Sequence, residues 1–214
     1  MPDDSTPTGT IVVSGTGRVA VQPDVADLRL GVTASKPTVE AARGEAAATM
    51  DAILRAVDGA GISRADVRTA MLSVQPRYDY RDGRAPVLTG YEIANIVEVS
   101  VRDLAVLGDV IDATLAAGAT SMDALTFRLA DPVPSERDAR RQAMAEARSR
   151  ADVLAEAAGL TILGVSDILE GQPQRPPGPI AKAERMALAA DAPTPVEAGT
   201  LEVTVTVSVT YRAT

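Results

Sequence analysis

The stretch Leu201-Glu-Val-Thr-Val-Thr-Val-Ser-Val-Thr-Tyr-Arg212 alternates aliphatic and polar residues from end to end. Successive side chains of a strand point to opposite faces of its sheet, so the alternation predicts a strand with one aliphatic and one Thr/Ser face. Its middle carries no charge, proline or glycine. Such a strand is prone to pair with other chains if one of its edges is open.

The longest helix is expected between Pro134 and Gly159. Four alanines recur there at steps of four and form a smooth face that can lie close to a sheet: Ala139, Ala143, Ala147 and Ala151. We expect Ser135 to cap this helix, with Asp138 in the place of the usual capping-box Glu or Gln. The arginines and carboxylates that interleave between Glu136 and Asp152 are typical of a solvated, ion-paired helix face.

The rest of the chain alternates strands and helices. Period-2 patterns predict strands at residues 11–21, 27–33, 66–80, 89–102, 121–129 and 161–170, and apolar faces predict helices at 37–60 and 104–117. The order ββαββαβαββ indicates an α+β fold, with largely antiparallel sheets and helices packed on one face. One compact domain is favoured over two. Residues 1–10 are expected to be a disordered tail, and residues 171–198 a long Pro-rich loop.

Gly15 and Gly17 interrupt the first strand. Gly15-Thr-Gly17-x-x-Ala20 superficially fits a dinucleotide-binding fingerprint, but that fingerprint requires a helix directly after the glycines. Strand residues and Pro23 follow instead. We therefore interpret the two glycines as a β-bulge.

The composition excludes many kinds of chemistry. The 214 residues contain no His, Cys or Trp. This excludes Ser-His-Asp and Cys-His catalysis, thiol redox chemistry and N/S metal sites. Asp24 and Asp27 lie close in sequence and could suggest an acid/base pair or calcium ligands, yet no Asp-x-Asp-x-Asp-Gly calcium loop is present, and we favour an ordinary turn after Pro23. We expect no enzyme, no cofactor and no metal.

Net charge and hydropathy limit the classes of partner and the cellular location that the chain can have. The formal net charge is −8, the wrong sign for the basic field that a nucleic-acid-binding protein needs. No apolar stretch approaches the ~18–20 residues of a membrane span. Residues 1–10 lack the basic and apolar regions of a signal peptide, so the sequence as it stands predicts a cytoplasmic protein, or a periplasmic or secreted one if a signal has been removed.

The best candidate site is the tip of the hairpin predicted between residues 66 and 102. It concentrates tyrosine and arginine, the side chains enriched at interface hot spots. We expect a subunit or partner contact there, formed by Arg77, Tyr78, Tyr80, Arg81 and Arg84. A solvated hairpin end with aromatic cross-strand pairing is the alternative.

An ordered series of landmarks resembles the SIMPL-domain (DUF541) family from residue 11 to residue 212. The series comprises Val13–Asp24, Gly61-Ile62, Asp66–Thr69, Pro76–Tyr78, Gly90-Tyr91, Asn95, Ala117–Ala119, Phe127 and Gly199. The resemblance implies a bacterial protein that is often periplasmic or surface-associated and linked to stress tolerance. It also implies that some members form large symmetric homo-oligomers. The chain departs from the family in lacking its common secretory signal.

These observations together favour a non-enzymatic protein that assembles with itself into a homo-oligomer in a stress-related role. One alternative is a module that binds a ligand or another protein through the hairpin tip or the Pro-rich loop. A hydrolase that uses carboxylates alone is a weaker alternative.

Overall fold

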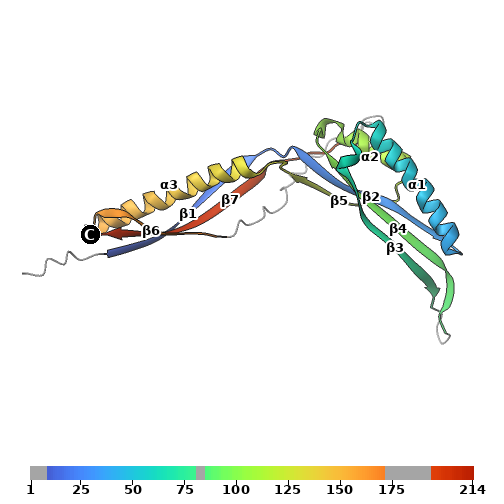
Figure 1. The fold of residues 1–214 in the computed structure, drawn as a ribbon, viewed down its shortest axis with the longest axis horizontal. Helices are drawn as coiled ribbons and strands as arrows, with labels where there is room; N and C mark the ends of the chain where they lie inside the picture. The colour runs from blue at the N-terminus through green and yellow to red at the C-terminus, as the bar shows by residue number, and fades with distance from the viewer. Residues whose placement is uncertain (1–8, 81–84, 172–193) are drawn as a thin grey trace, which may run out of the picture. The chain divides into compact units, whose positions relative to one another are not determined.

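The computed structural model describes residues 9–80, 85–171 and 194–214. Residues 1–8 of the expected disordered tail and residues 172–193 of the expected Pro-rich loop therefore lie outside the described residues. The tail's last two residues, 9 and 10, belong to β1, and residues 194–198 form the segment before β7. In chain order the elements are β1 (Gly9–Val21), β2 (Val25–Lys36), α1 (Val39–Gly59), β3 (Val67–Asp79), β4 (Val87–Val101), α2 (Leu107–Ala116), β5 (Ser121–Arg128), α3 (Val133–Ala158), β6 (Ile162–Glu170) and β7 (Leu201–Ala213). The predicted order ββαββαβαββ and the α+β class are confirmed (Figure 1).

The described chain divides into two compact units, each with one sheet and its own core. The first unit, of residues 9–22, 129–171 and 199–214, holds a three-stranded antiparallel sheet in the order β1-β7-β6. β7 is therefore the central strand of this sheet, hydrogen-bonded on both sides. The condition for this strand to pair with another chain, an open edge, is not met, because β1 and β6 hydrogen-bond to its two edges.

Helix α3 covers one face of the three-stranded sheet. Its alanine stripe is buried as predicted, and Ala155 extends it by one more turn. The stripe packs on the inward residues of β1 and β7: Ile11, Val13, Val205, Val207, Val209 and Tyr211. An alanine face brings the helix backbone close to the sheet because no longer side chain keeps the two layers apart.

The interpretation of Gly15 and Gly17 as a bulge is wrong. β1 pairs with β7 in unbroken register from Gly9↔Ala213 to Val21↔Leu201. A Cβ atom built on Gly15 would lie 2.0 Å from the carbonyl oxygen of Ala143, and one on Gly17 only 1.8 Å from that of Ala139. The two glycines are therefore the places where β1 passes directly beneath the backbone of α3.

The start of α3 also differs from the prediction. The helix begins at Val133, two residues before Ser135. Its N-cap residue is Pro132, which makes no side-chain capping hydrogen bond. Asp131 supplies an acceptor instead, since the amide of Val133 donates to its Oδ1 at 3.0 Å. Pro134 fits in the first turn, where a missing N–H costs no hydrogen bond.

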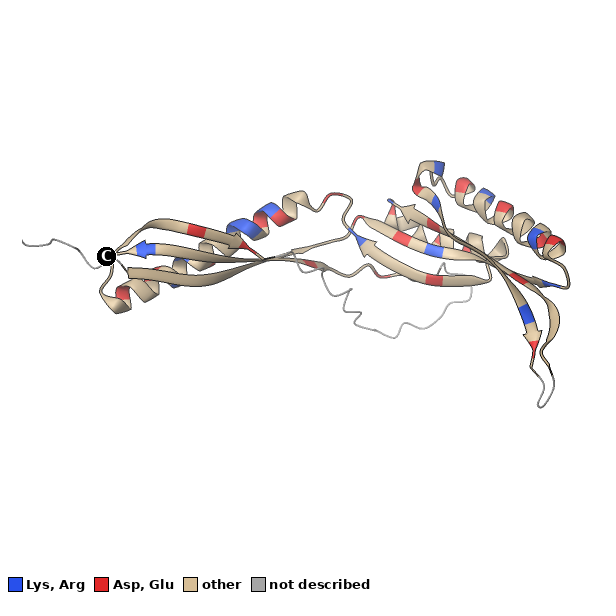
Figure 2. Ribbon diagram, turned by 60° about the horizontal axis from the view of Figure 1, so that its bottom comes forward, with Lys and Arg blue, Asp and Glu red and all other residues tan. Residues whose placement is uncertain are grey.

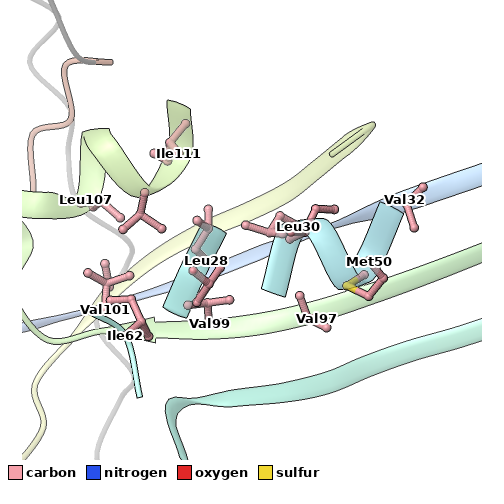
Figure 3. Close-up of a cluster of buried hydrophobic side chains, with 14 of the residues drawn as sticks. Leu28, Leu30, Val32, Met50, Ile62, Val97, Val99, Val101, Leu107 and Ile111 are labelled. Carbon is pink, nitrogen blue, oxygen red and sulfur yellow. The ribbon is translucent and has the colours of Figure 1, made fainter. Parts of the chain in front are cut away.

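The second unit, of residues 23–80, 85–128 and 194–198, holds an antiparallel sheet in the order β3-β4-β2-β5. Helices α1 and α2 cover one face of it. Figure 3 shows the core between these layers, where Leu28, Leu30 and Val32 of β2 and Val97, Val99 and Val101 of β4 meet Met50 of α1 and Leu107 and Ile111 of α2. The helices reach the two middle strands and leave the flank of β3 without a helical cover.

The β3–β4 hairpin continues past the end of β2. The last pair between β2 and β4 is Lys36↔Tyr91, and beyond it β4 pairs with β3 alone, down to Asp79↔Val87. Gly90 permits this arrangement, because a Cβ atom there would lie 2.6 Å from the carbonyl oxygen of Lys36. The predicted long antiparallel hairpin is confirmed, and its distal part lies outside the packed sheet.

Candidate interaction surface

Two tyrosines lie near the end of the hairpin. Their ring centroids are 6.4 Å apart with the ring planes inclined by 59°, a tilted geometry that aromatic pairs favour. Both rings are exposed, and Tyr80 keeps 76% of its surface in solvent. Across the hairpin, Tyr78 pairs with Leu88 and Asp79 with Val87, and both aliphatic side chains are also exposed. The hairpin end therefore presents a small apolar surface with phenol groups on it.

Arg77 stands at the base of this surface. It donates from Nη1 to the hydroxyl of Ser35 at 3.3 Å, and its Nε lies 4.0 Å from Glu92 Oε2. Arg77 therefore faces the neighbouring strands, whereas the two tyrosines extend farther along the hairpin. Arg81 and Arg84, the other expected contact residues, lie outside the described residues.

The whole of β3 is poorly covered. None of its thirteen residues is buried, although the strand contains Met71, Leu72 and Val74. Leu72 is 67% exposed. β3 is also an outer strand, hydrogen-bonded to β4 on one side only. Within the described part of the chain, its outer edge and its aliphatic side chains are thus open along the same stretch.

A shallow hollow of about 430 Å³ lies in the first unit, lined by Val13, Ser14, Ser149, Arg150, Val153 and Leu154. A second hollow, of about 280 Å³, lies beside the hairpin base and contains Lys36 and Arg77. Lys36 forms an ion pair with Glu45, and Arg77 lies beside Glu92. Because both cations already have carboxylate neighbours, we assign this second hollow no separate function.

Asp27 lies on the face of the four-stranded sheet opposite the helices. Arg128 holds its carboxylate with Nε at 2.6 Å and Nη2 at 3.2 Å, and the hydroxyl of Ser100 donates to it at 2.6 Å. Partial burial on its own would raise the pKa of Asp27, but these hydrogen bonds and the guanidinium charge outweigh it and lower that pKa. A carboxylate held in this way acts as a structural ion pair.

The described residues provide little else for chemistry. No group of three or more acidic side chains among them gathers closely enough to hold a metal ion. None of the described helices is long and apolar enough to cross a membrane. Acidic and basic residues interleave along the helices in Figure 2, as the sequence predicted for α3.

Comparison with known proteins places the chain in a family. The family model for SIMPL, described as a protein of unknown function (DUF541), matches residues 11–211. The chain belongs to the SIMPL family. The resemblance inferred from the landmarks is thereby confirmed.

This SIMPL protein is 32% identical over 209 residues to the 26 kDa periplasmic immunogenic protein of Brucella melitensis. The match covers 94% of this chain and 84% of the Brucella protein. It is also 32% identical over 145 residues to the uncharacterized protein YggE of Escherichia coli K12, across 68% of this chain and 58% of YggE. YggE of Edwardsiella ictaluri is 29% identical over 152 residues.

Part of the exposed surface could not be predicted from the sequence. The pattern indicates exposed Tyr78 and Tyr80, but not the exposed aliphatic side chains of β3 or those of β6: Leu163, Val165, Ile168 and Leu169. Aliphatic residues in a strand pattern usually indicate a covered face. β3 and β6 are outer strands that lie beside the strands on which the described helices pack, and this tertiary arrangement leaves their aliphatic side chains in solvent.

Proposed function

We propose that this SIMPL protein is a non-enzymatic assembly protein, which joins copies of itself into a closed homo-oligomer. The observation that carries the proposal is β3, an outer strand of thirteen residues with no buried residue and with exposed Met71, Leu72 and Val74. Proteins that remain monomeric usually protect such edges with charge, proline or a covering element. Between Arg68 and Arg77, β3 carries no charge; its protection there is limited to Pro76 and to one irregularity in its register with β4, between Thr69 and Met71.

The end of the hairpin supports the same function. Tyr78 and Tyr80 add aromatic surface next to Val87 and Leu88. Aromatic anchors of this kind dominate the energy of protein interfaces because they bury a large area with few rotatable bonds. Most soluble assemblies of identical subunits are closed and symmetric.

The proposal that the protein is not an enzyme rests on which reactive side chains the sequence contains. Without His or Cys, proton transfer and nucleophilic attack near neutral pH depend on carboxylates, lysine or tyrosine. Asp27, which the sequence singled out, is held by Arg128 as an ion pair with a lowered pKa. A general acid requires the opposite shift, a carboxyl pKa raised towards neutrality.

Light scattering on the purified chain at micromolar concentration tests the assembly. We expect a single species of at least dimeric mass, and a smaller mass for the double variant Tyr78→Ser/Tyr80→Ser. Leu115→Ser is the matched control, because Leu115 is exposed on α2, away from the hairpin. A monomeric parent protein overturns the function. An oligomeric parent whose tyrosine variant keeps the full mass removes the hairpin end from the contact.

We also propose a periplasmic location, because the Brucella relative is a periplasmic immunogenic protein by name. Fractionation of the native bacterium tests this: recovery with periplasmic marker proteins supports the proposal, and recovery with the cytoplasm contradicts it. The stress-related role has its own test, which is the survival of a deletion strain under oxidative or osmotic stress compared with its parent.

A further inference from the structure

The three-stranded sheet has two outer strands, and one of them is closed by side chains. Gln142, Glu146 and Arg150 follow one another at steps of four on α3 and reach over the outer edge of β1. The amide of Arg18 donates to Gln142 Oε1 at 3.1 Å, and the amide of Thr16 donates to Glu146 Oε2 at 2.5 Å. Arg150 Nη1 donates to the carbonyl oxygen of Ser14 at 2.8 Å.

These three contacts occupy alternate residues of β1, which are the positions whose main-chain groups face away from β7. They take the hydrogen bonds that a neighbouring strand would otherwise make. Arg150 also donates to Glu146 at 2.6 Å, so that the side chains support one another. Gly15 and Gly17 bring α3 close enough to β1 for this reach. The middle of the β1 edge is therefore closed to strand addition.

The other outer strand, β6, is different. Among the described residues, the ion pair between α3 and β6 joins two side chains, Arg140 Nε and Glu170 Oε1 at 2.9 Å, and does not involve the main chain of β6. Leu163, Val165, Ile168 and Leu169 are all exposed, with Leu169 at 64%. β6 has no proline and no lysine or arginine, and its two charges are the acids Asp167 and Glu170.

β3 of the second unit is the complementary edge. Its uncharged stretch Thr69–Pro76 carries the exposed Met71, Leu72 and Val74. Arg68 and Arg77 flank this stretch. Each has a glutamate of β4 beside it, Glu98 and Glu92 respectively, but keeps more than half of its side chain in solvent, so that N–H donors remain for a second carboxylate. A strand with carboxylates and aliphatic side chains, such as β6, matches it in both charge and hydropathy. Cross-strand pairs of opposite charge and of aliphatic residues are the pairs that stabilise a sheet.

We propose that the outer edge of β6 in one copy of the chain pairs with the outer edge of β3 in a second copy. This rests on the proposed self-assembly and names the surfaces that join. Pairing of β3 with β3, antiparallel and centred on its uncharged stretch, sets Arg68 opposite Arg77, whereas pairing of β6 with β6 brings together strands with acidic charges only. Since the two edges differ, the contact is head-to-tail and produces a ring when the rotation closes.

Two edge variants test the pairing. Val165→Lys/Ile168→Lys blocks β6, and Leu72→Lys/Val74→Lys blocks β3; all four side chains are exposed, so the parent melting temperature should be kept. We expect each variant alone to be monomeric by light scattering and an equal mixture to form a 1:1 dimer, because each supplies the edge that the other lacks. Val12→Lys, at an equally exposed position of β1, is the control and should keep the parent mass.

The outcomes separate this pairing from the proposed function. A monomeric parent protein overturns self-assembly itself. If the parent is oligomeric but the mixture forms no dimer, the β6–β3 pairing is overturned and self-assembly still holds. The same follows if the β6-blocked variant keeps the full parent mass, a result that indicates β3–β3 contacts.

A second measurement covers the case in which a lysine variant fails to fold. The chain has no cysteine, so the single variants Gln75→Cys in β3 and Leu169→Cys in β6 can be joined by a short bismaleimide. We expect cross-linked heterodimers in the mixture and little cross-linking of either variant alone. Cross-linking of each variant mainly with itself overturns the pairing.

Discussion

Gly15 and Gly17 fix the distance between α3 and β1. Any side chain at either position would have to displace the helix backbone, because the nearest atoms are the carbonyl oxygens of Ala143 and Ala139. The same close approach brings Glu146 and Arg150 within hydrogen-bonding distance of β1. Two residues without side chains therefore determine both the packing of α3 and the closure of the β1 edge.

Gly17→Ala should lower the free energy of unfolding by at least about 1–3 kcal/mol, the usual cost of overpacking. Gly44→Ala is the control, because Gly44 lies in α1 with open space around its Cβ position. There the change should stabilise the helix by about 1 kcal/mol. Urea denaturation of both variants measures this, and equal stabilities would show that α3 does not sit against β1 at Gly17.

Asp27 makes a pH-dependent contribution. Its pKa is lowered in the folded protein. Its ion pair with Arg128 therefore stabilises the fold at pH values above the ordinary Asp pKa of 3.8. That stability is lost as the pH falls through the lower, folded-state pKa. Asp27→Asn should therefore cost about 1 kcal/mol at pH 7, since Arg128 is partly exposed.

Denaturation at pH 7 and pH 3 checks the Asp27 prediction. The gap between the parent and Asp27→Asn should narrow at the lower pH. Asp123→Asn, at an exposed position of β5, should change the stability by less than about 0.5 kcal/mol at either pH. A gap of constant size between the two pH values would mean that the Asp27 carboxylate does not contribute through its charge.

At the scale of elements, α3 has three functions on three sides. Its alanine stripe packs on the sheet, Gln142, Glu146 and Arg150 close the β1 edge, and Arg140 reaches Glu170 of β6. In the sequence, the polar side chains that close the β1 edge resemble an ordinary solvated, ion-paired helix face. Two other pairs on α3 do form such a face, Arg148 with Asp152 and Arg141 with Asp138.

Ala147→Leu should destabilise the protein by about 1–3 kcal/mol, because Ala147 is fully buried at the contact between α3 and β1. Ala145→Leu, two residues away on the exposed face of α3, should be close to neutral. Thermal melting of the two variants provides the comparison. A melting temperature unchanged by Ala147→Leu would show that this helix face does not pack on the sheet.

At the scale of the whole molecule, the two units are built differently along the chain. Residues 23–128 contain every strand and helix of the four-stranded unit, together with the buried residues of its core. The three-stranded unit needs β1 from the beginning of the chain and β7 from its end. Of the described residues outside 23–128, those that join the four-stranded unit lie in the segment before β7, where Thr194 bonds to Asp112 and Val196 and Ala198 pack on the core.

A fragment of residues 23–128 should accordingly fold on its own and melt cooperatively. A fragment of residues 129–214 should not, because it lacks β1 and with it the core residues Ile11 and Val13. Circular dichroism and amide dispersion in NMR spectra distinguish the two results. A folded 129–214 fragment, or an unfolded 23–128 fragment, would contradict this division of the chain.

The sequence by itself determined the type and order of the elements and the buried faces of β7 and α3. The alternation at residues 201–212 and the alanine stripe of α3 are local patterns, and side-chain direction in a strand or helix follows from backbone geometry alone. The hairpin and its tyrosines were predictable for the same reason. Tertiary structure alone decided that β7 is central, that Gly15 and Gly17 face a helix, and that β3 and β6 are outer strands with exposed aliphatic residues. Whether a strand lies at an edge depends on which distant segments hydrogen-bond to it, and no local pattern records that.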